Sequence, residues 1–199
     1  MLLTDIKTTV EPQIEPVTVK ELKDYLKLDY TTDDALLTAL ICSARQWAEK
    51  YTSRSFICRT LKAHFENHSE KVRLPYAPIY SVTTVTRVRE NQSSTLTLNS
   101  DYYVNGVADK YLTLSSLGFG NVPPGVSPLD NLQSWNLEVT FVAGYGYSAS
   151  DIPSGIRHGV LRLAGYLYEN RNEVEVGTII AKVPFGIRAV LDPYKVIHI

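Results

Sequence analysis

The sequence predicts an α+β fold: a three-helix bundle with an antiparallel β module inserted between its second and third helices, followed by an extended C-terminal tail. Apolar residues recur at helical spacing before residue 54 and after residue 150, and they alternate with polar residues in between. Proline and glycine interrupt the apolar C-terminal end. The predicted parts are an N-terminal arm (1–16), the helical bundle (17–54 and 150–173), the inserted β module (55–149) and a C-terminal docking tail (174–199).

The composition is that of an ordinary folded protein. Of the 199 residues, 44% are hydrophobic and 21% are charged, which is far from the composition of disordered chains. Because 20 Lys and Arg nearly balance 21 Asp and Glu, we expect no strong overall attraction to nucleic acid or to an anionic membrane. The N-terminus lacks the pattern of a secretory signal, so we expect a cytosol-like compartment in which Cys42 and Cys58 stay reduced.

Two helices are predicted in the first part of the bundle. Thr18 and Glu21 have the spacing of a capping box, which predicts a short helix beginning there. A longer helix is predicted from Asp34 to about Tyr51, because apolar residues share one of its faces. These residues are Leu37, Leu40, Ile41, Ala44, Trp47, Ala48 and Tyr51.

A third helix is predicted after Ser150 or Asp151, with Pro153 in its first turn, where a missing amide proton costs little. Its apolar stripe comprises Ile156, Val160, Leu163 and Leu167. Three glycines inside this helix each cost roughly 1 kcal/mol relative to alanine, so we expect close helix packing to compensate. Ala44 and Ala48 of the second helix offer a small surface that could match Gly155, Gly159 and Gly165.

The middle of the chain predicts roughly five or six strands, because β-branched residues alternate with polar ones from about residue 56. The spacing of Val82, Val85 and Val88 departs from strict alternation, which indicates a bulge or a two-sided strand. Residues 117–133 are rich in Gly and Pro and predict one long loop.

Catalytic and metal-binding patterns are not found in the sequence. The four histidines are scattered, no nucleophile elbow occurs, and neither cysteine has a histidine nearby in the sequence, so we predict no enzyme activity, no metal and no cofactor. Arg87 and Arg89 lie two apart in a strand pattern. They could meet phosphate or could simply belong to a solvated strand edge.

The C-terminal segment from Val183 to Ile199 is unusually apolar for a chain end. Burial of each large side chain contributes about 1.5–3 kcal/mol, so we expect the segment to be buried against protein. The residues alone leave two destinations open: the core of its own chain, or another chain.

Several motifs in order resemble those of the head-tail connector (adaptor) proteins of tailed double-stranded DNA phages and gene transfer agents. The similar stretches are "EPVTVKELKDYLKLDYTTDDALLTALICSARQWAEKYTSRSF", "LPYAPIYSVTTV", "VTFVAGYG", "IPSGIRHGVLRLAGYLYENRNE" and "VPFGIRAVLDPY". They extend from about Glu15 to Tyr194. The stretch 174–183 is the part that resembles the family least.

This resemblance implies a structural virion protein of the neck that assembles in the host cytoplasm. It implies a ring, usually of twelve copies, that binds beneath the portal protein after DNA packaging and extends the DNA channel toward the tail. Further implied partners are a stopper or tail-completion protein and passing duplex DNA that is not specifically bound, with no membrane. The implied portal- or neighbour-binding residues are Phe185, Gly186, Ile187, Arg188, Leu191, Pro193 and Tyr194.

Two alternatives stay open beside the connector. One is a stopper or tail-completion protein of the neck, and the other is a packaging accessory that binds DNA through surface arginines. The basic residues for a DNA channel or surface would be Arg87, Arg89, Arg157 and Arg162. If the tail docks on another chain, deletion of Val183–Ile199 should leave a folded protein that no longer joins portal-bearing heads.

Overall fold

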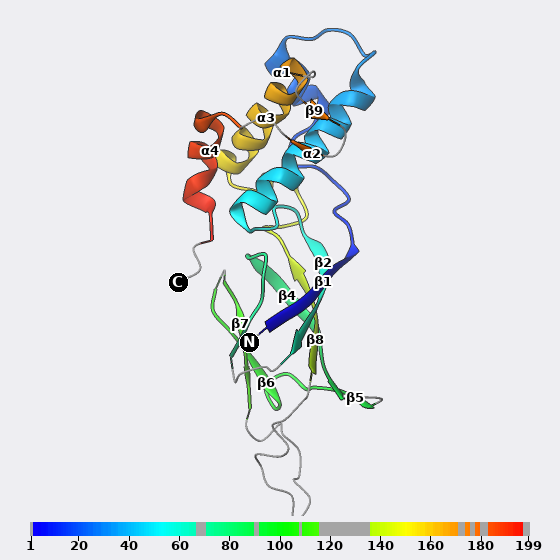
Figure 1. Cartoon of the computed structure of the whole chain (residues 1–199), viewed down its shortest axis with the longest axis vertical. Helices are drawn as coiled ribbons and strands as arrows, with labels where there is room; N and C mark the ends of the chain where they lie inside the picture. Colours follow the sequence, from blue (N-terminus) through cyan, green and yellow to red (C-terminus); the bar gives the residue numbers. More distant parts are fainter. Residues whose placement is uncertain are drawn as a thin grey trace, which may run out of the picture. The chain divides into compact units, whose positions relative to one another are not determined.

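The computed structural model describes residues 2–66, 71–89, 92–107, 109–115, 136–170, 174–175, 178–179 and 183–196. For Leu2, Arg89, Gln92, 174–175 and 178–179, no side chain is described. The chain mixes helices with antiparallel sheets, as predicted, and divides into two compact units (Figure 1). The β unit comprises Met1–Glu11 and Cys58–Gly144, and the helical unit comprises Pro12–Ile57 and Tyr145–Ile199.

The described residues of the β unit form two antiparallel sheets that share one apolar core. The larger sheet has five strands in the order β1-β2-β8-β4-β5, and the smaller has three in the order β3-β7-β6. The strands are β1 (Leu2–Val10), β2 (Arg59–Glu66), β3 (Lys71–Arg73), β4 (Ile79–Arg89), β5 (Gln92–Thr95), β6 (Tyr102–Asn105), β7 (Tyr111–Leu114) and β8 (Asn136–Ala143).

The alternation that predicts the strands also sets their two faces. In β8, Leu137, Val139 and Phe141 are fully buried while the residues between them are partly exposed, as expected when successive side chains point to opposite faces of a sheet. The break in alternation in β4, for which a bulge or a two-sided strand was open, coincides with irregular pairing, because the pairing of β4 with β8 shifts register at Ile79/Ser81 and at Val82/Thr84. The predicted loop at 117–133 lies outside the described residues.

The predicted N-terminal arm is extended, and its first part is strand β1. It pairs antiparallel with β2, where Ile6 faces Ala63 and Thr8 faces Leu61. Among the described side chains of this strand, Ile6 is the hydrophobic residue that packs against the β core. The N-terminal segment therefore completes the edge of the larger sheet mainly through backbone pairing.

The helical unit contains four α-helices in its described residues, so a fourth helix joins the three that the sequence predicts. The capping box at Thr18 and Glu21 is confirmed at the start of α1. All four helices contribute to one apolar core. The helices of this unit are α1 (Val19–Leu26), α2 (Asp34–Thr52), α3 (Ser154–Glu169) and α4 (Phe185–Leu191). The unit also has 3-10 turns at Ala149–Asp151 and Asp192–Tyr194 and two short paired strands, β9 (Val174–Glu175) and β10 (Thr178–Ile179).

The expectation of an extended tail is wrong for Phe185–Tyr194, which are helical. Pro184 precedes α4 and therefore does not interrupt its backbone hydrogen bonds. Pro193 lies in the 3-10 turn that follows the helix. The prolines that suggested an extended segment thus flank a short helix.

A buried ionic network supports the helical unit beside its apolar core. The guanidinium of Arg45 donates to Glu15 over 2.7 Å and to Glu49 over 2.9 Å. Glu49 also accepts a hydrogen bond from the backbone N–H of Phe56 over 2.7 Å. Burial works to lower the pKa of Arg45, but its carboxylate partners raise it overall, so the side chain stays charged.

Candidate functional site

The C-terminal segment from Val183 to Val196 is the candidate functional site, and it packs on α3 at two glycines. A Cβ atom at Gly155 would lie 2.5 Å from the hydroxyl oxygen of Tyr194, and one at Gly159 would lie 2.6 Å from Leu191 Cδ2. Real Cβ atoms do not approach other atoms so closely, so the two glycines make room for the segment.

The third glycine of this helix serves another contact. A Cβ at Gly165 would lie 2.9 Å from Tyr25 Cε1, so this position accommodates α1. The expected match of the glycines with Ala44 and Ala48 is therefore not what the structure shows. The glycines instead accommodate α1 and the C-terminal segment.

Tyr51, near the end of α2, holds the segment by its side chain. Its hydroxyl donates to Asp192 Oδ1 over 2.5 Å, and Lys195 Nζ lies 4.8 Å from the centroid of its ring. The hydrogen bond to Asp192 raises the pKa of Tyr51, and burial adds to the effect. The ring of Tyr51 also stacks on Trp47 at a centroid distance of 5.0 Å. These contacts attach the segment to α2.

The C-terminal end of α2 makes a second attachment through backbone groups. The N–H of Val196 donates to the carbonyl of Thr52 over 2.9 Å, and Arg54 Nε donates to the carbonyl of Tyr194. The last carbonyls of a helix have no partner within the helix, so the segment satisfies one of them. Lys195 also brings positive charge to this end, where the helix dipole favours it.

The predicted docking residues divide into two groups, and the first faces inward. Ile187 is 3% exposed and Leu191 is fully buried, both in the core of the helical unit. Tyr194 and Arg188 are half-buried, and Tyr194 packs on Gly155. In this structure Ile187 and Leu191 bind their own chain and are not accessible to another.

The second group of predicted docking residues faces outward. Phe185 is 76% exposed, although it directly follows the N-cap of α4 and lies two residues from buried Ile187. Gly186 and Pro193 are also exposed. Phe185 leaves most of its aromatic ring in contact with water, and aromatic side chains are enriched at protein interfaces, so we take this group as a candidate contact surface.

Two of the four predicted basic residues make contacts within the helical unit. Arg157 pairs with Glu21 of the capping box and donates to the carbonyl of Pro16 over 3.0 Å. Arg162 donates to the carbonyl of Gly186 over 3.4 Å. Both arginines therefore tie α3 to neighbouring segments of their own unit.

The other two predicted basic residues lie in β4. Arg87 is only 8% exposed, and burial lowers its pKa. Arg87 is thus not a surface residue, contrary to the expectation of a solvated strand edge. The side chain of Arg89 lies outside the described part of the chain.

Other groupings of polar residues support structure. The hydroxyl of Tyr168 donates to Asp33 over 2.6 Å and lies 2.8 Å from that of Tyr30, and the bond to Asp33 raises the pKa of Tyr168.

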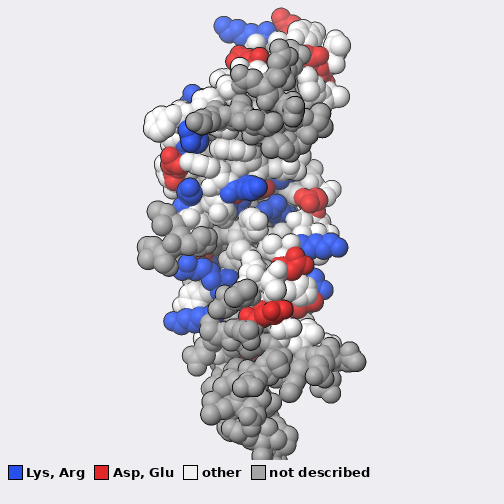
Figure 2. Space-filling view, viewed as in Figure 1, with Lys and Arg blue, Asp and Glu red and all other residues white. Residues whose placement is uncertain are grey.

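Among the described residues, no three His, Cys, Asp or Glu side chains converge as metal ligands would. Lys and Arg are interspersed with Asp and Glu on the visible face (Figure 2). Within the described part of the chain, no helix is both long and apolar enough to cross a membrane.

Sequence reasoning missed the residues that receive the C-terminal segment. These are Tyr51, Thr52 and Arg54 at the end of α2, with Gly155 and Gly159 on α3. The spacing of the two glycines, one helical turn apart, was a signal of close packing. The sequence could not tell which of several apolar segments fills the space.

Part of the sequence is similar to a described family of virion proteins. Residues 16–113 match the family described as phage gp6-like head-tail connector protein, which is similarity over about half of the chain. The resemblance to head-tail connectors indicated by the sequence motifs is thus confirmed. The family consists of structural proteins rather than enzymes. No curated protein matches the chain.

Solved structures with a similar fold come from gene transfer agent (GTA) particles. A chain in the neck of an empty GTA particle, computed with C6 symmetry, has a TM-score of 0.73 at 20% identity, covering 98% of this chain and 97% of that chain. A chain in the virion of a native GTA particle has a TM-score of 0.73 at 21% identity, covering 98% and 96%. A chain in the neck of a native particle, computed with C12 symmetry, has a TM-score of 0.67 at 23% identity, covering 100% and 97%.

Proposed function

We propose that the chain is a ring-forming head-tail connector subunit in the virion neck, at the head-tail junction. The observation that carries the proposal is the family match over residues 16–113, and the fold likeness to GTA neck proteins over nearly the whole chain supports it. One similar structure was computed with C12 symmetry, which supports twelve copies in the ring. The subunits are made in the host cytoplasm and join the particle during assembly.

The proposed ring binds beneath the portal protein after DNA packaging and extends the DNA channel toward the tail. Twenty basic and 21 acidic residues leave a formal net charge of −1 per chain, so a ring of this protein would not grip DNA strongly as it passes. A stopper or tail-completion protein would bind the opposite end of the ring. Individual contacts can be modest, because repetition around the ring multiplies them.

The portal- or neighbour-binding surface in this proposal is the outward group of Phe185, Gly186 and Pro193. Aromatic side chains are enriched at protein interfaces, and Phe185 exposes 76% of its surface. The sequence suggested portal or neighbour binding also for Ile187, Leu191 and Tyr194. In this proposal these three residues instead hold the segment in place on the helical unit. Arg188, half-buried between the two groups, contributes charge at the edge of the surface.

Substitution of Phe185 by alanine tests this proposal. The variant should fold normally, because the side chain is exposed, but should no longer join portal-bearing heads when the two are mixed and sedimented. Val107→Ala is the matched control, since Val107 is 93% exposed in the β unit and is not part of the proposed surface. If Phe185→Ala joins heads as well as wild type, the outward group is not the portal contact.

Mixing with purified portal protein separates the connector from a stopper or tail-completion protein. A connector should sediment with purified portal protein when no other neck protein is present. A stopper should sediment with the portal only after the connector ring has been added. An electron micrograph of the particle neck with this chain located in it would test the position directly. The contacts of Arg87, Arg157 and Arg162 within their own units do not favour a DNA-binding accessory that acts through these residues.

A further inference from the structure

The outer face of the three-stranded sheet β3-β7-β6 carries basic and aromatic side chains that the connector function does not use. Val72 and Leu112 are fully buried in the β core. Their strand neighbours therefore point to the opposite face, because successive side chains alternate across a sheet. On β3 and β7 these neighbours are Lys71, Arg73, Tyr111 and Thr113, and Lys71 and Arg73 are exposed.

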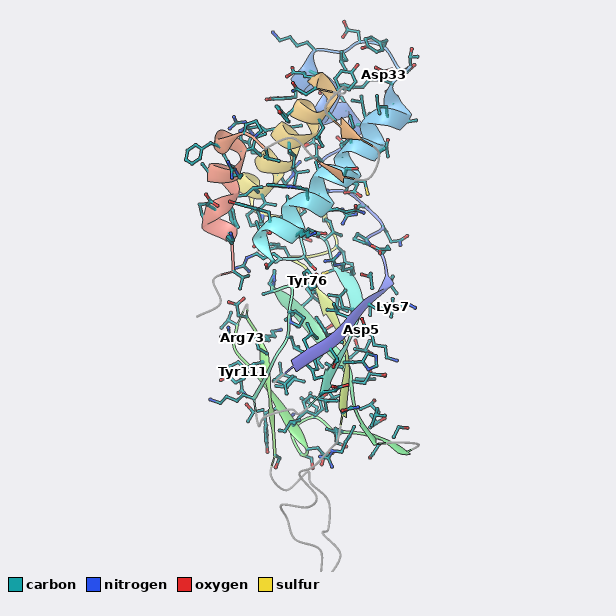
Figure 3. The ribbon with its side chains drawn as sticks, in the orientation of Figure 1. Asp5, Lys7, Asp33, Arg73, Tyr76 and Tyr111 are labelled. Atoms are coloured by element: carbon teal, nitrogen blue, oxygen red, sulfur yellow. The ribbon has the colours of Figure 1, made fainter. Side chains whose placement is uncertain are left out.

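The strand register brings two cations to one tyrosine. Arg73 is directly opposite Tyr111 in the pairing of β3 with β7, and the two residues lie side by side on this sheet (Figure 3). Lys71 lies diagonally across from Tyr111, and its Nζ is 5.8 Å from the centroid of the ring. This distance is typical of a cation–π contact, which orients the lysine over the tyrosine.

These three side chains line a pocket of about 300 Å³, among the residues that the structure describes. Lysine and arginine carry only hydrogen-bond donors, and the tyrosine hydroxyl adds another donor. A ligand that satisfies them must offer several acceptor oxygens and negative charge. Phosphate does so, and arginine beside lysine is a common arrangement for binding it.

The same face continues onto β6 with a second aromatic side chain. Tyr103 is directly opposite Thr113 and is 44% exposed, while its neighbour Tyr102 faces the core. The strands β3, β7 and β6, all of whose residues are described, contain no acidic residue. Two described carboxylates flank these strands: Asp101, which accepts a hydrogen bond from the N–H of Thr97 over 2.7 Å, and exposed Asp109, two residues before Tyr111.

We propose that this face is a binding site for the phosphodiester backbone of a nucleic acid, with a phosphate in the pocket formed by Lys71, Arg73 and Tyr111. Positive charge that follows the backbone, together with exposed aromatic rings, is how proteins bind nucleic acid without reading its sequence. An acidic peptide would satisfy the two cations but would bring no nucleobase to stack on Tyr103. The proposal goes beyond the connector function and does not depend on it, because it concerns the surface of a single β unit.

Binding of the full-length chain to fluorescein-labelled DNA, single-stranded and duplex, tests the proposal by fluorescence anisotropy at low salt. Two phosphate contacts predict a slope of log affinity against log salt of about −1.4 for a single strand and about −1.8 for a duplex. The double variant Lys71→Gln/Arg73→Gln should bind roughly tenfold more weakly or worse, with a slope near zero.

The matched control removes the same charge elsewhere. Lys20→Gln/Lys50→Gln changes two exposed lysines of the helical unit and should leave affinity and salt slope unchanged. Equal weakening by both double variants would mean that only net charge matters and would overturn the proposal. Absence of binding to either DNA at low salt would overturn it as well.

Two further measurements identify the ligand. Tyr103→Ala should weaken single-strand binding roughly five- to hundredfold if a base stacks on the ring, and should not affect a duplex, whose bases are covered. Ultraviolet cross-linking of the wild-type chain to bromouracil-substituted DNA should attach to β3, β7 or β6. If polyglutamate displaces DNA as well as unlabelled DNA does, the face recognises carboxylates of a protein partner and the proposal is wrong.

Discussion

The two ends of the described chain complete two different units by different means. Strand β1 adds to the edge of a sheet through backbone pairing, and among its described hydrophobic side chains Ile6 alone packs against the β core. The segment that contains α4 instead buries Val183, Ile187 and Leu191 in the helical core. Backbone hydrogen bonds exchange for bonds to water on unfolding, whereas buried apolar side chains contribute directly to stability. The C-terminal segment should therefore matter more for stability than the N-terminal strand.

Deletion of Val183–Ile199 should have the largest effect. Loss of three buried apolar side chains, at about 1.5–3 kcal/mol each, removes on the order of 5 kcal/mol, which is comparable with the total stability of many domains. The sequence alone led us to expect that the shortened protein would stay folded, and the burial of these side chains reverses that expectation. Hydrogen exchange measured by mass spectrometry should show α2 and α3 losing protection while the β unit keeps it. Full protection of α2 and α3 would contradict the assignment of the segment to the core.

The next largest effect is expected for Leu191→Ala. Leu191 is fully buried against Gly159, so its truncation should lower the free energy of unfolding of the helical unit by about 2–5 kcal/mol in urea titration. Phe185→Ala in the same helix is the control and should change stability little, because Phe185 is 76% exposed. A cost for Leu191→Ala below that of the control would show that α4 does not support the core.

The corresponding substitution in the N-terminal strand sharpens the comparison. Ile6 is only partly buried in the β core, so Ile6→Ala should cost about 1 kcal/mol, read from hydrogen exchange of β2. Lys7→Ala, one residue away, serves as the control, since Lys7 lies on the opposite side of the strand from Ile6. If Ile6→Ala were as costly as Leu191→Ala, the two ends would not differ in the way proposed.

The smallest effect concerns the capping box that Arg157 supports. The carboxylate of Glu21 accepts hydrogen bonds from the N–H of Thr18, over 2.7 Å, and from its hydroxyl, and pairs with Arg157, which together hold its pKa below the ordinary 4.5. A lowered pKa contributes stability that is complete above the ordinary value and is lost as the pH falls through the lower folded-state value.

Glu21→Gln should therefore cost about 1 kcal/mol near neutral pH, and the difference from wild type should shrink in acid. Urea titrations of both proteins across the acid range measure it. Asp24→Asn, which changes an exposed carboxylate of the same helix, is the control and should cost less at neutral pH. A difference between Glu21→Gln and wild type that stays constant down to the lowest pH would contradict the assignment.

The sequence predicted the elements whose signals are local. The helix at Asp34–Thr52 and the one at Ser154–Glu169 follow from apolar periodicity, and the capping box at Thr18 follows from two residues three apart. The irregular pairing in β4 was likewise visible as a break in alternation. Each of these features depends on neighbours within a few residues.

The features that sequence reasoning missed depend on partners far away in the chain. Strand β1 pairs with β2, some fifty residues on, and its own alternation is too short to show this. Arg87 looked like a surface residue because its charge suggested exposure, whereas in the fold it is only 8% exposed. The tail residues Ile187 and Leu191 look the same in sequence whether they bind their own core or a partner, since both destinations require apolar side chains.

The division of the chain into units has a consequence for how the protein is made. Every segment of the β unit has been synthesised once Gly144 has left the ribosome, so this unit can fold while the rest of the chain is still being translated. The helical unit must wait, because Ile187 and Leu191 come near the end of translation. Until then α2 and α3 have an incomplete apolar surface. The part of the subunit that matures last is thus the part that carries Phe185, so that a newly made chain cannot present its proposed contact surface before it is complete.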